Sequence, residues 1–176
     1  MAVTASATPS LNIAYSLTQT DPKLAVSENA SIGYSNITFS NGTGIGNINF
    51  GVNRSGSLSS GGTETFDLKS LFKSVYNTGI DVNFTGIRGL LVTNTYDAPT
   101  GMVASNIPYF NVVASGLNGL SGLFNGGSGN VKVRAKSTWV LTDYVAIPTN
   151  TTNRQISLID SGSGVPYEMI IIGVTG

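Results

Sequence analysis

The side chains that most enzymes use for chemistry near neutral pH are missing from this chain. Its 176 residues include no histidine and no cysteine. Histidine is the commonest general base and metal ligand, and cysteine supplies thiolates for nucleophilic attack and for metal binding. A Ser-His-Asp triad, a Cys-His dyad, a disulfide and a thiolate metal site are therefore excluded. We expect a protein that is not an enzyme and that has no catalytic residues, no cofactor and no metal site.

Nine acidic residues leave one kind of catalysis open, which is glycoside hydrolysis by two carboxylates. The acids are scattered along the chain, and Glu64 and Asp67 lie too close together in one segment to face each other across a cleft. A calcium loop of the Asp-x-Asp-x-Asp-Gly type does not occur. A two-carboxylate glycosidase stays an alternative, and it requires a cleft with acids about 5–9.5 Å apart.

Residues 116–129 read GLNGLSGLFNGGSG and raise the question of a phosphate-binding loop. A Walker loop needs Lys and then Ser or Thr directly after its last glycine, but the next lysine here is Lys132. The segment instead repeats leucine every third residue, and an apolar ridge on a Gly-rich loop is unfavourable when exposed. We expect these side chains either to fold back over the core or to contact a neighbouring subunit. The candidate interface residues are Leu117, Leu120, Leu123 and Phe124.

Three of the nine basic residues, Lys132, Arg134 and Lys136, alternate along NVKVRAKST at 130–138. Alternation on a strand places their side chains on one face. Such a face can bind an acidic protein partner or nucleic acid, or it can stay solvated and discourage edge-to-edge pairing. Because the net charge is zero and no aromatic residue precedes Trp139 in this stretch, we expect no nucleic-acid binding. A protein interface and a solvated face both stay open.

Short segments that alternate apolar and polar residues predict the strands that position these side chains. The segment 63–72 alternates at first and then permits a short helical turn at 68–76, and the strand 80–94 is expected to break at Gly86. The apolar runs LLV at 90–92 and MIIIGV at 169–174 predict central strands that are buried on both faces. Expected strands are 11–17, 31–39, 46–52, 63–72, 80–94, 108–115, 130–138, 138–147, 155–160 and 167–174, with turns at 40–44, 53–56, 59–62, 96–101, 148–153 and 161–164.

Many short strands without long helices between them predict an all-β fold. We expect an antiparallel β-sandwich, jelly-roll-like or with another Greek-key order. Residues 11–176 are expected to form a single domain. The small polar residues 1–10 are expected to form an extended N-terminal arm. Trp139 is expected in the core rather than on a sugar-binding surface.

The surface implied by the composition is polar but nearly uncharged. Charged residues make up 10% of the chain, against about 25% in an ordinary globular protein. Surface charge normally keeps a free monomer soluble, so a low-charge surface favours a component of a larger assembly. The N-terminus has no signal-peptide pattern, and no stretch reaches the roughly 18 apolar residues of a membrane span. We expect synthesis in a cytoplasm and no membrane partner.

Residues 66–176 resemble the small β-sandwich virion proteins of tailed bacteriophages, of the capsid decoration or cement type. The resemblance is carried by GIRGLLVTNT (86–95), QISLIDSGSG (155–164) and YEMIIIGVTG (167–176). In that family a strand ending LLV.N meets a later strand ending I.I.N.GS, and a terminal Y.I.IIG strand completes the sheet. Asp160 departs from this pattern, in which asparagine is expected. The resemblance implies no catalytic residues.

The same resemblance implies a capsid decoration or cement protein in the virion, at the capsid surface. Its partner would be the major capsid protein, and we expect a homotrimer that binds the outer surface of a phage head and stabilises it. Two alternatives stay open. One is a carbohydrate- or receptor-binding module, with exposed Tyr96, Tyr109 and Tyr144. The other is a jelly-roll subunit that forms the shell itself.

Overall fold

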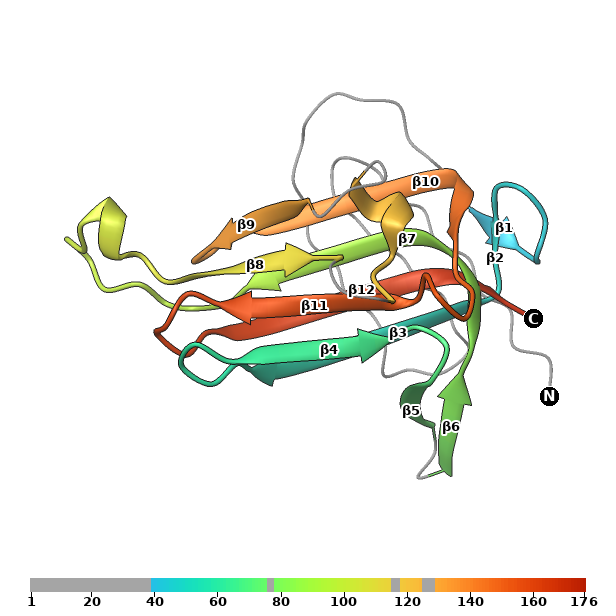
Figure 1. The fold of residues 1–176 in the computed structure, drawn as a ribbon, viewed down its shortest axis with the longest axis horizontal. Coiled ribbons are helices and arrows are strands. Elements are labelled where there is room, and N and C mark those ends of the chain that lie inside the picture. Colours follow the sequence, from blue (N-terminus) through green and yellow to red (C-terminus); the bar gives the residue numbers. More distant parts are fainter. Residues whose placement is uncertain (1–38, 76–77, 115–117, 125–128) are drawn as a thin grey trace.

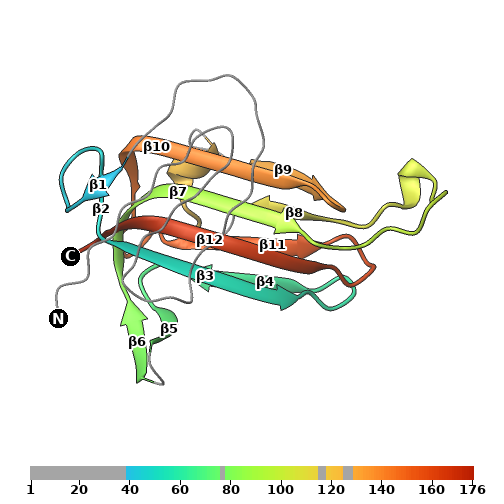
Figure 2. The same cartoon turned by 180° about the vertical axis from the view of Figure 1, so that it is seen from behind.

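The fold is seen in a computed structural model that describes residues 39–75, 78–114, 118–124 and 129–176 (Figures 1 and 2). The expected arm 1–10, the expected strand 11–17 and nearly all of 31–39 lie outside these residues. The elements are β1 Ser40–Asn41, β2 Asn47–Ile48, β3 Phe50–Ser57, β4 Thr63–Asp67, β5 Leu71–Val75, β6 Thr78–Val82, β7 Phe84–Asn94, η1 Ala104–Asn106, β8 Tyr109–Val113, η2 Ser121–Phe124, β9 Asn130–Arg134, β10 Thr138–Pro148, β11 Gln155–Asp160 and β12 Pro166–Thr175.

Two four-stranded antiparallel sheets form a sandwich, with the strand orders β10-β7-β12-β3 and β4-β11-β8-β9. Every connection between consecutive strands of the sandwich crosses from one sheet to the other, except β8–β9, and the crossing from β4 to β7 contains β5 and β6. The first half of the chain pairs with the second half in reverse, as β3–β12, β4–β11, β7–β10 and β8–β9. This is a long hairpin rolled into two sheets, which is the jelly-roll order. The prediction of an all-β antiparallel sandwich is confirmed.

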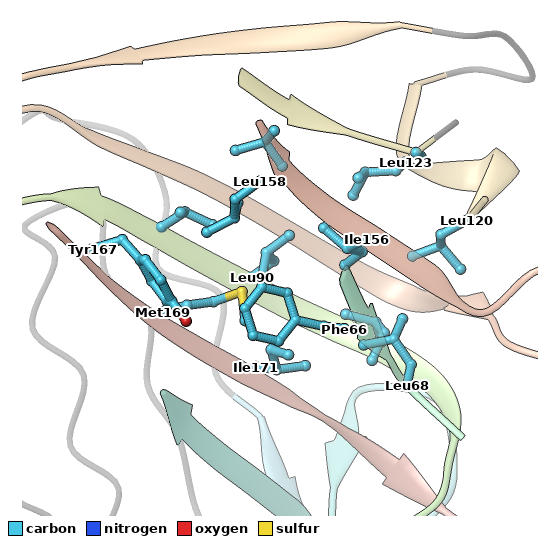
Figure 3. Packing of buried hydrophobic residues seen from close by; sticks show 14 of the residues in the cluster. Phe66, Leu68, Leu90, Leu120, Leu123, Ile156, Leu158, Tyr167, Met169 and Ile171 are labelled. Atoms are coloured by element: carbon cyan, nitrogen blue, oxygen red, sulfur yellow. The ribbon is translucent and has the colours of Figure 1, made fainter. Parts of the chain in front are cut away.

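The core lies between the two sheets and is lined by the inward side chains of both. Figure 3 shows Phe66, Leu90, Leu158 and Met169 pointing toward one another from four different strands. Leu90 and Met169 are wholly buried there, and the phenyl ring of Phe66 packs edge-on against Tyr167 at 5.9 Å. Burial of such side chains is the main favourable term in folding.

The strands β7 and β12 are the two central strands of their sheet and are apolar on both faces. Their outward side chains Leu91, Ile170 and Ile172 belong to a second buried cluster with Phe39 and Ile48. The prediction of central strands at LLV and MIIIGV is therefore confirmed.

The helical turn expected at 68–76 is wrong. The Asp67 carboxylate accepts a hydrogen bond from the backbone N–H of Lys69 at 3.0 Å and forms a turn, after which the chain extends into β5. This local competition is characteristic of Asp side chains. The strands β5 and β6 form a hairpin that projects from the sandwich (Figure 1). Its base is fixed by buried Leu71 and Val82, whereas Phe72 is exposed.

Two other expectations at glycines are also wrong. The stretch 53–56 does not form a turn but continues β3, where it pairs with β12. Gly56 is required there because a Cβ would lie 2.8 Å from the hydroxyl of Tyr167. The break in 80–94 falls at Asn83, between β6 and β7, and not at Gly86. Gly86 continues β7 at a place where a Cβ would lie 3.0 Å from Cβ of Ala146.

Candidate functional site

The Gly-Leu segment folds back on the core of its own chain. Leu120 and Leu123 lie on one side of the 3₁₀ turn η2 and are 0% and 5% exposed. Residues three apart line up in such a turn, which explains the leucine repeat. The interface prediction for these two leucines is therefore wrong, because their side chains already fill the core (Figure 3). Leu117 lies outside the described residues.

The turn η2 lies between the start of β11 and the end of β10. The backbone N–H of Leu120 donates to the carbonyl oxygen of Gln155 at 2.9 Å, at the start of β11. A Cβ on Gly122 would lie 2.6 Å from Cγ2 of Ile147, near the end of β10. Phe124 stacks on Trp139, with ring centroids 5.9 Å apart. Phe124 is half-buried, and Trp139 packs against the core as expected.

The basic residues divide into two groups. Lys132 and Arg134 lie on β9, point away from the core and are exposed. Lys136 was expected on the same strand, but β9 ends at Arg134 and Lys136 lies in the turn before β10 with φ of 57°. Its ammonium group pairs with the carboxylate of Asp97 at 2.5 Å. Hydrogen bonding and charge attraction from Lys136 lower the pKa of Asp97.

The ammonium group of Lys132 lies 3.6 Å from the ring centroid of Tyr109, a cation–π contact across the β8–β9 pair. Tyr96 is half-buried and packs against the core. The side chain of Tyr144 lies outside the described part. These contacts occupy the rings at 96 and 109 that a sugar-binding surface would need to leave open.

The sheet β4-β11-β8-β9 forms one layer of the sandwich (Figure 1). Most side chains on the outward side of this sheet are uncharged. Its inward residues are apolar, so the alternate positions point to solvent. Strand register places Thr63, Ile159, Asn111 and Lys132 in one row across all four strands. We call the outward residues that are exposed or half-buried the polar face. They are Thr63, Thr65, Asp67, Tyr109, Asn111, Asn130, Lys132, Arg134, Gln155 and Ile159.

Asp160 joins two loops at the end of the sandwich, and the sequence reasoning gave it no role. Its Oδ2 accepts hydrogen bonds from the backbone N–H groups of Gly162 (2.7 Å), Gly61 (2.9 Å) and Gly164 (3.1 Å). Burial, the largest single influence, raises the pKa of Asp160, but the backbone donors together outweigh it, so the pKa is lowered. The carboxylate therefore fixes the β3–β4 turn against the β11–β12 turn.

Asn94 has the same function for the neighbouring connections. It is wholly buried and donates to the carbonyl oxygens of Val133 (3.1 Å) and Pro108 (3.4 Å). Its Oδ1 accepts from the N–H of Tyr96 at 3.0 Å. Asn94 is the asparagine of the LLV.N pattern. Gly162 and Gly164, which follow Asp160, were the sequence signal that could have indicated the role of Asp160. Together Asn94 and Asp160 hydrogen-bond to the four loops at this end of the sandwich, which are β3–β4, β7–β8, β9–β10 and β11–β12.

Glu64 and Asp67 are also held in structural contacts. Burial raises the pKa of Tyr167, and the adjacent Glu64 raises it further by hydrogen bonding and charge, against a smaller opposite effect of Arg54. Asp67 forms an ion pair with Arg154, with Oδ2 and Nε 3.1 Å apart. Within residues 39–75, 78–114, 118–124 and 129–176, no three acidic side chains gather as a metal site would require. The described residues also contain no helix long and apolar enough to cross a membrane.

Comparison with known proteins adds one structural likeness. No model of a protein family matches the chain, and no curated protein matches it. Among solved structures, the fold is similar to the Yersinia pseudotuberculosis-derived mitogen (YPM), at a TM-score of 0.31 and 10% sequence identity. The match covers 71% of this chain and 86% of the mitogen. A likeness at this level carries no argument about function.

Proposed function

We propose that this chain is a non-catalytic structural protein of a phage virion, which binds the outer surface of the head and stabilises it. The observation that carries the proposal is the polar face. It spans the four strands of one sheet and consists mostly of uncharged side chains. Such a surface can approach another protein closely without burying charges that lack partners, which is costly.

Three further features support the proposal. The strands that carry the resemblance to phage virion proteins, from β7 to β12, form most of the sandwich. The chain has zero net charge and few charged residues, as a surface covered by subunits tolerates. Asn94 and Asp160 fix the loops at one end, so a partner would meet a preformed surface and little ordering entropy would be lost on binding.

The test is binding to heads of the encoding phage assembled without this gene. Purified chain should co-sediment with these heads at a fixed copy number and should raise the temperature at which they release DNA. Light scattering should give three times the chain mass of 18.2 kDa if the free protein is the expected trimer. Heads that bind no chain at any concentration would refute the proposed function.

A second candidate function is favoured by the strand order itself. Eight-stranded jelly rolls form the shells of many viruses, so the chain can alternatively be the shell-forming subunit. That function predicts closed particles from the purified chain alone. Electron microscopy of concentrated chain distinguishes the two functions, because a decoration protein gives only small oligomers.

A further inference from the structure

The polar face carries one negative charge, that of Asp67 on β4, which pairs with Arg154, and two positive charges that lie along the opposite margin. Lys132 and Arg134 are exposed on β9, the edge strand of the sheet. In the described part of the chain neither forms an ion pair with a carboxylate. Lys132 instead rests on the ring of Tyr109. This margin therefore carries two positive charges in a chain whose formal net charge is zero.

The other basic side chains near this sheet are neutralised locally. Lys136 pairs with Asp97, and Arg154 pairs with Asp67 at the far corner of the sheet. The chain contains nine acidic residues, but in the described structure none of their carboxylates forms an ion pair with Lys132 or Arg134. Charged side chains on an edge strand also discourage pairing with other sheets.

The centre of the face is uncharged. The row from Thr63 through Ile159 and Asn111 reaches a charge only at Lys132. Protein interfaces have the same anatomy, with charged residues depleted at the centre and polar groups at the rim. Rim charges mainly set the association rate and the choice of partner.

We propose that the polar face docks on an acidic protein surface of the phage head, with carboxylates of that surface opposite Lys132 and Arg134. The inference rests on the proposed function and adds the chemistry of the partner. A polysaccharide or a single-stranded nucleic acid fits less well, because such ligands stack on open aromatic rings and the ring of Tyr109 is covered by Lys132. Charge complementarity thus selects a protein with exposed acids.

The decisive variant is the double substitution Lys132→Gln and Arg134→Gln in the full chain. Both side chains are exposed, so the variant should unfold at the same temperature as the original protein. Its affinity for gene-deleted heads should fall about tenfold at physiological salt, and its affinity should depend less on salt concentration. The matched control is Lys136→Asn, which removes a positive charge outside the face and suits the positive φ at that position. The control should bind as the original chain does.

The outcomes separate the inference from the function on which it rests. If the original chain binds heads and the double variant binds equally well at every salt concentration, the docking face is wrong while the proposed function stands. If the original chain does not bind heads, both are wrong. Double-stranded DNA and heparin serve as further probes. Binding to either as tightly as to heads, lost in the double variant, would show a site for anionic polymers and overturn the protein partner.

Discussion

The carboxylate of Asp160 should contribute a large part of the stability at the loop end of the sandwich. Asp160→Ala removes the acceptor of three backbone N–H groups, those of Gly61, Gly162 and Gly164. A hydrogen bond to a charged group contributes about 1.5–3 kcal/mol, and donors in turns recover part of that by binding water. Counting about 1 kcal/mol for each donor gives a loss of about 3 kcal/mol in the free energy of unfolding.

Asp160→Asn is the more informative change because it keeps the shape of the side chain. An amide oxygen in place of Oδ2 retains the three bonds at about half their strength. The new NH₂ group takes the place of Oδ1, which is buried and has no hydrogen-bond partner among the described residues. We expect a loss of about 2 kcal/mol at pH 7, between the original protein and Asp160→Ala.

The difference in stability between the original protein and the Asp160→Asn variant should depend on pH in one direction. The pKa of Asp160 is lowered in the folded protein, so the folded state favours the ionised form. The stabilisation is complete above the unfolded pKa of about 3.9 and is lost as the pH falls through the folded pKa. Other carboxylates titrate in both proteins and cancel. The two proteins should therefore differ clearly at about pH 7 and converge as the pH falls through the folded pKa of Asp160.

Urea denaturation followed by the fluorescence of Trp139, the single tryptophan, measures this directly. Asp97→Asn is the control, since Asp97 and its partner Lys136 are both exposed and the ion pair should contribute nothing measurable. Equal unfolding midpoints for the original protein and Asp160→Asn at pH 7, or a difference that does not change with pH, would refute the reasoning.

Three further changes test the packing of the core and the elements that border it. Leu120→Ala should cost about 2–5 kcal/mol in urea denaturation, because the side chain is wholly buried and a cavity replaces it; a loss below about 1 kcal/mol would mean that the leucine is not in the core. Gly122→Ala should cost about 1–3 kcal/mol because the new methyl group meets Ile147, whereas Gly44→Ala, with no contact closer than 3.4 Å, should change little. Tyr167→Phe should reduce alkaline denaturation: the raised pKa of Tyr167 favours the neutral phenol in the folded state, so its stabilisation is present below about pH 10 and lost above it. Unfolding midpoints at about pH 8 and about pH 11 measure this, and an unchanged alkaline loss would contradict it.

The strands that could be predicted from the sequence are those whose local pattern agrees with their place in the sheet. QISLID matches β11, and YEMIIIGV lies within β12, because both sit between clear turns and carry β-branched residues. The errors arose where a distant strand decided the outcome. Residues 53–56 have the composition of a turn, but pairing with β12 keeps them extended. Strand order could not be read either, because it depends on contacts between opposite ends of the chain.

The candidate site was only partly predictable for the same reason. The alternation of Lys132 and Arg134 correctly placed both on one exposed face, since two residues on a strand share a side whatever the topology. The leucine repeat left open whether these side chains cover the core or contact a neighbouring subunit. That depends on the gap beside Ile147 and Gln155, which the local sequence does not reveal. Asp160 was noticed only as a departure from a family pattern, and its hydrogen bonds explain why a carboxylate occupies the position.

The rolled hairpin also sets the order in which the protein can fold as it is synthesised. Phe50 of β3 pairs with Gly173 of β12, and the central strand β7 lies between β10 and β12, both of which follow it. While the ribosome is still translating the second half, β3 and the apolar strand β7 therefore lack their partners. Pairings this distant in sequence form slowly, and unpaired apolar strands are prone to aggregate. We expect the nascent chain to depend on chaperones until β12 emerges, and a chain truncated before Pro166 to be insoluble.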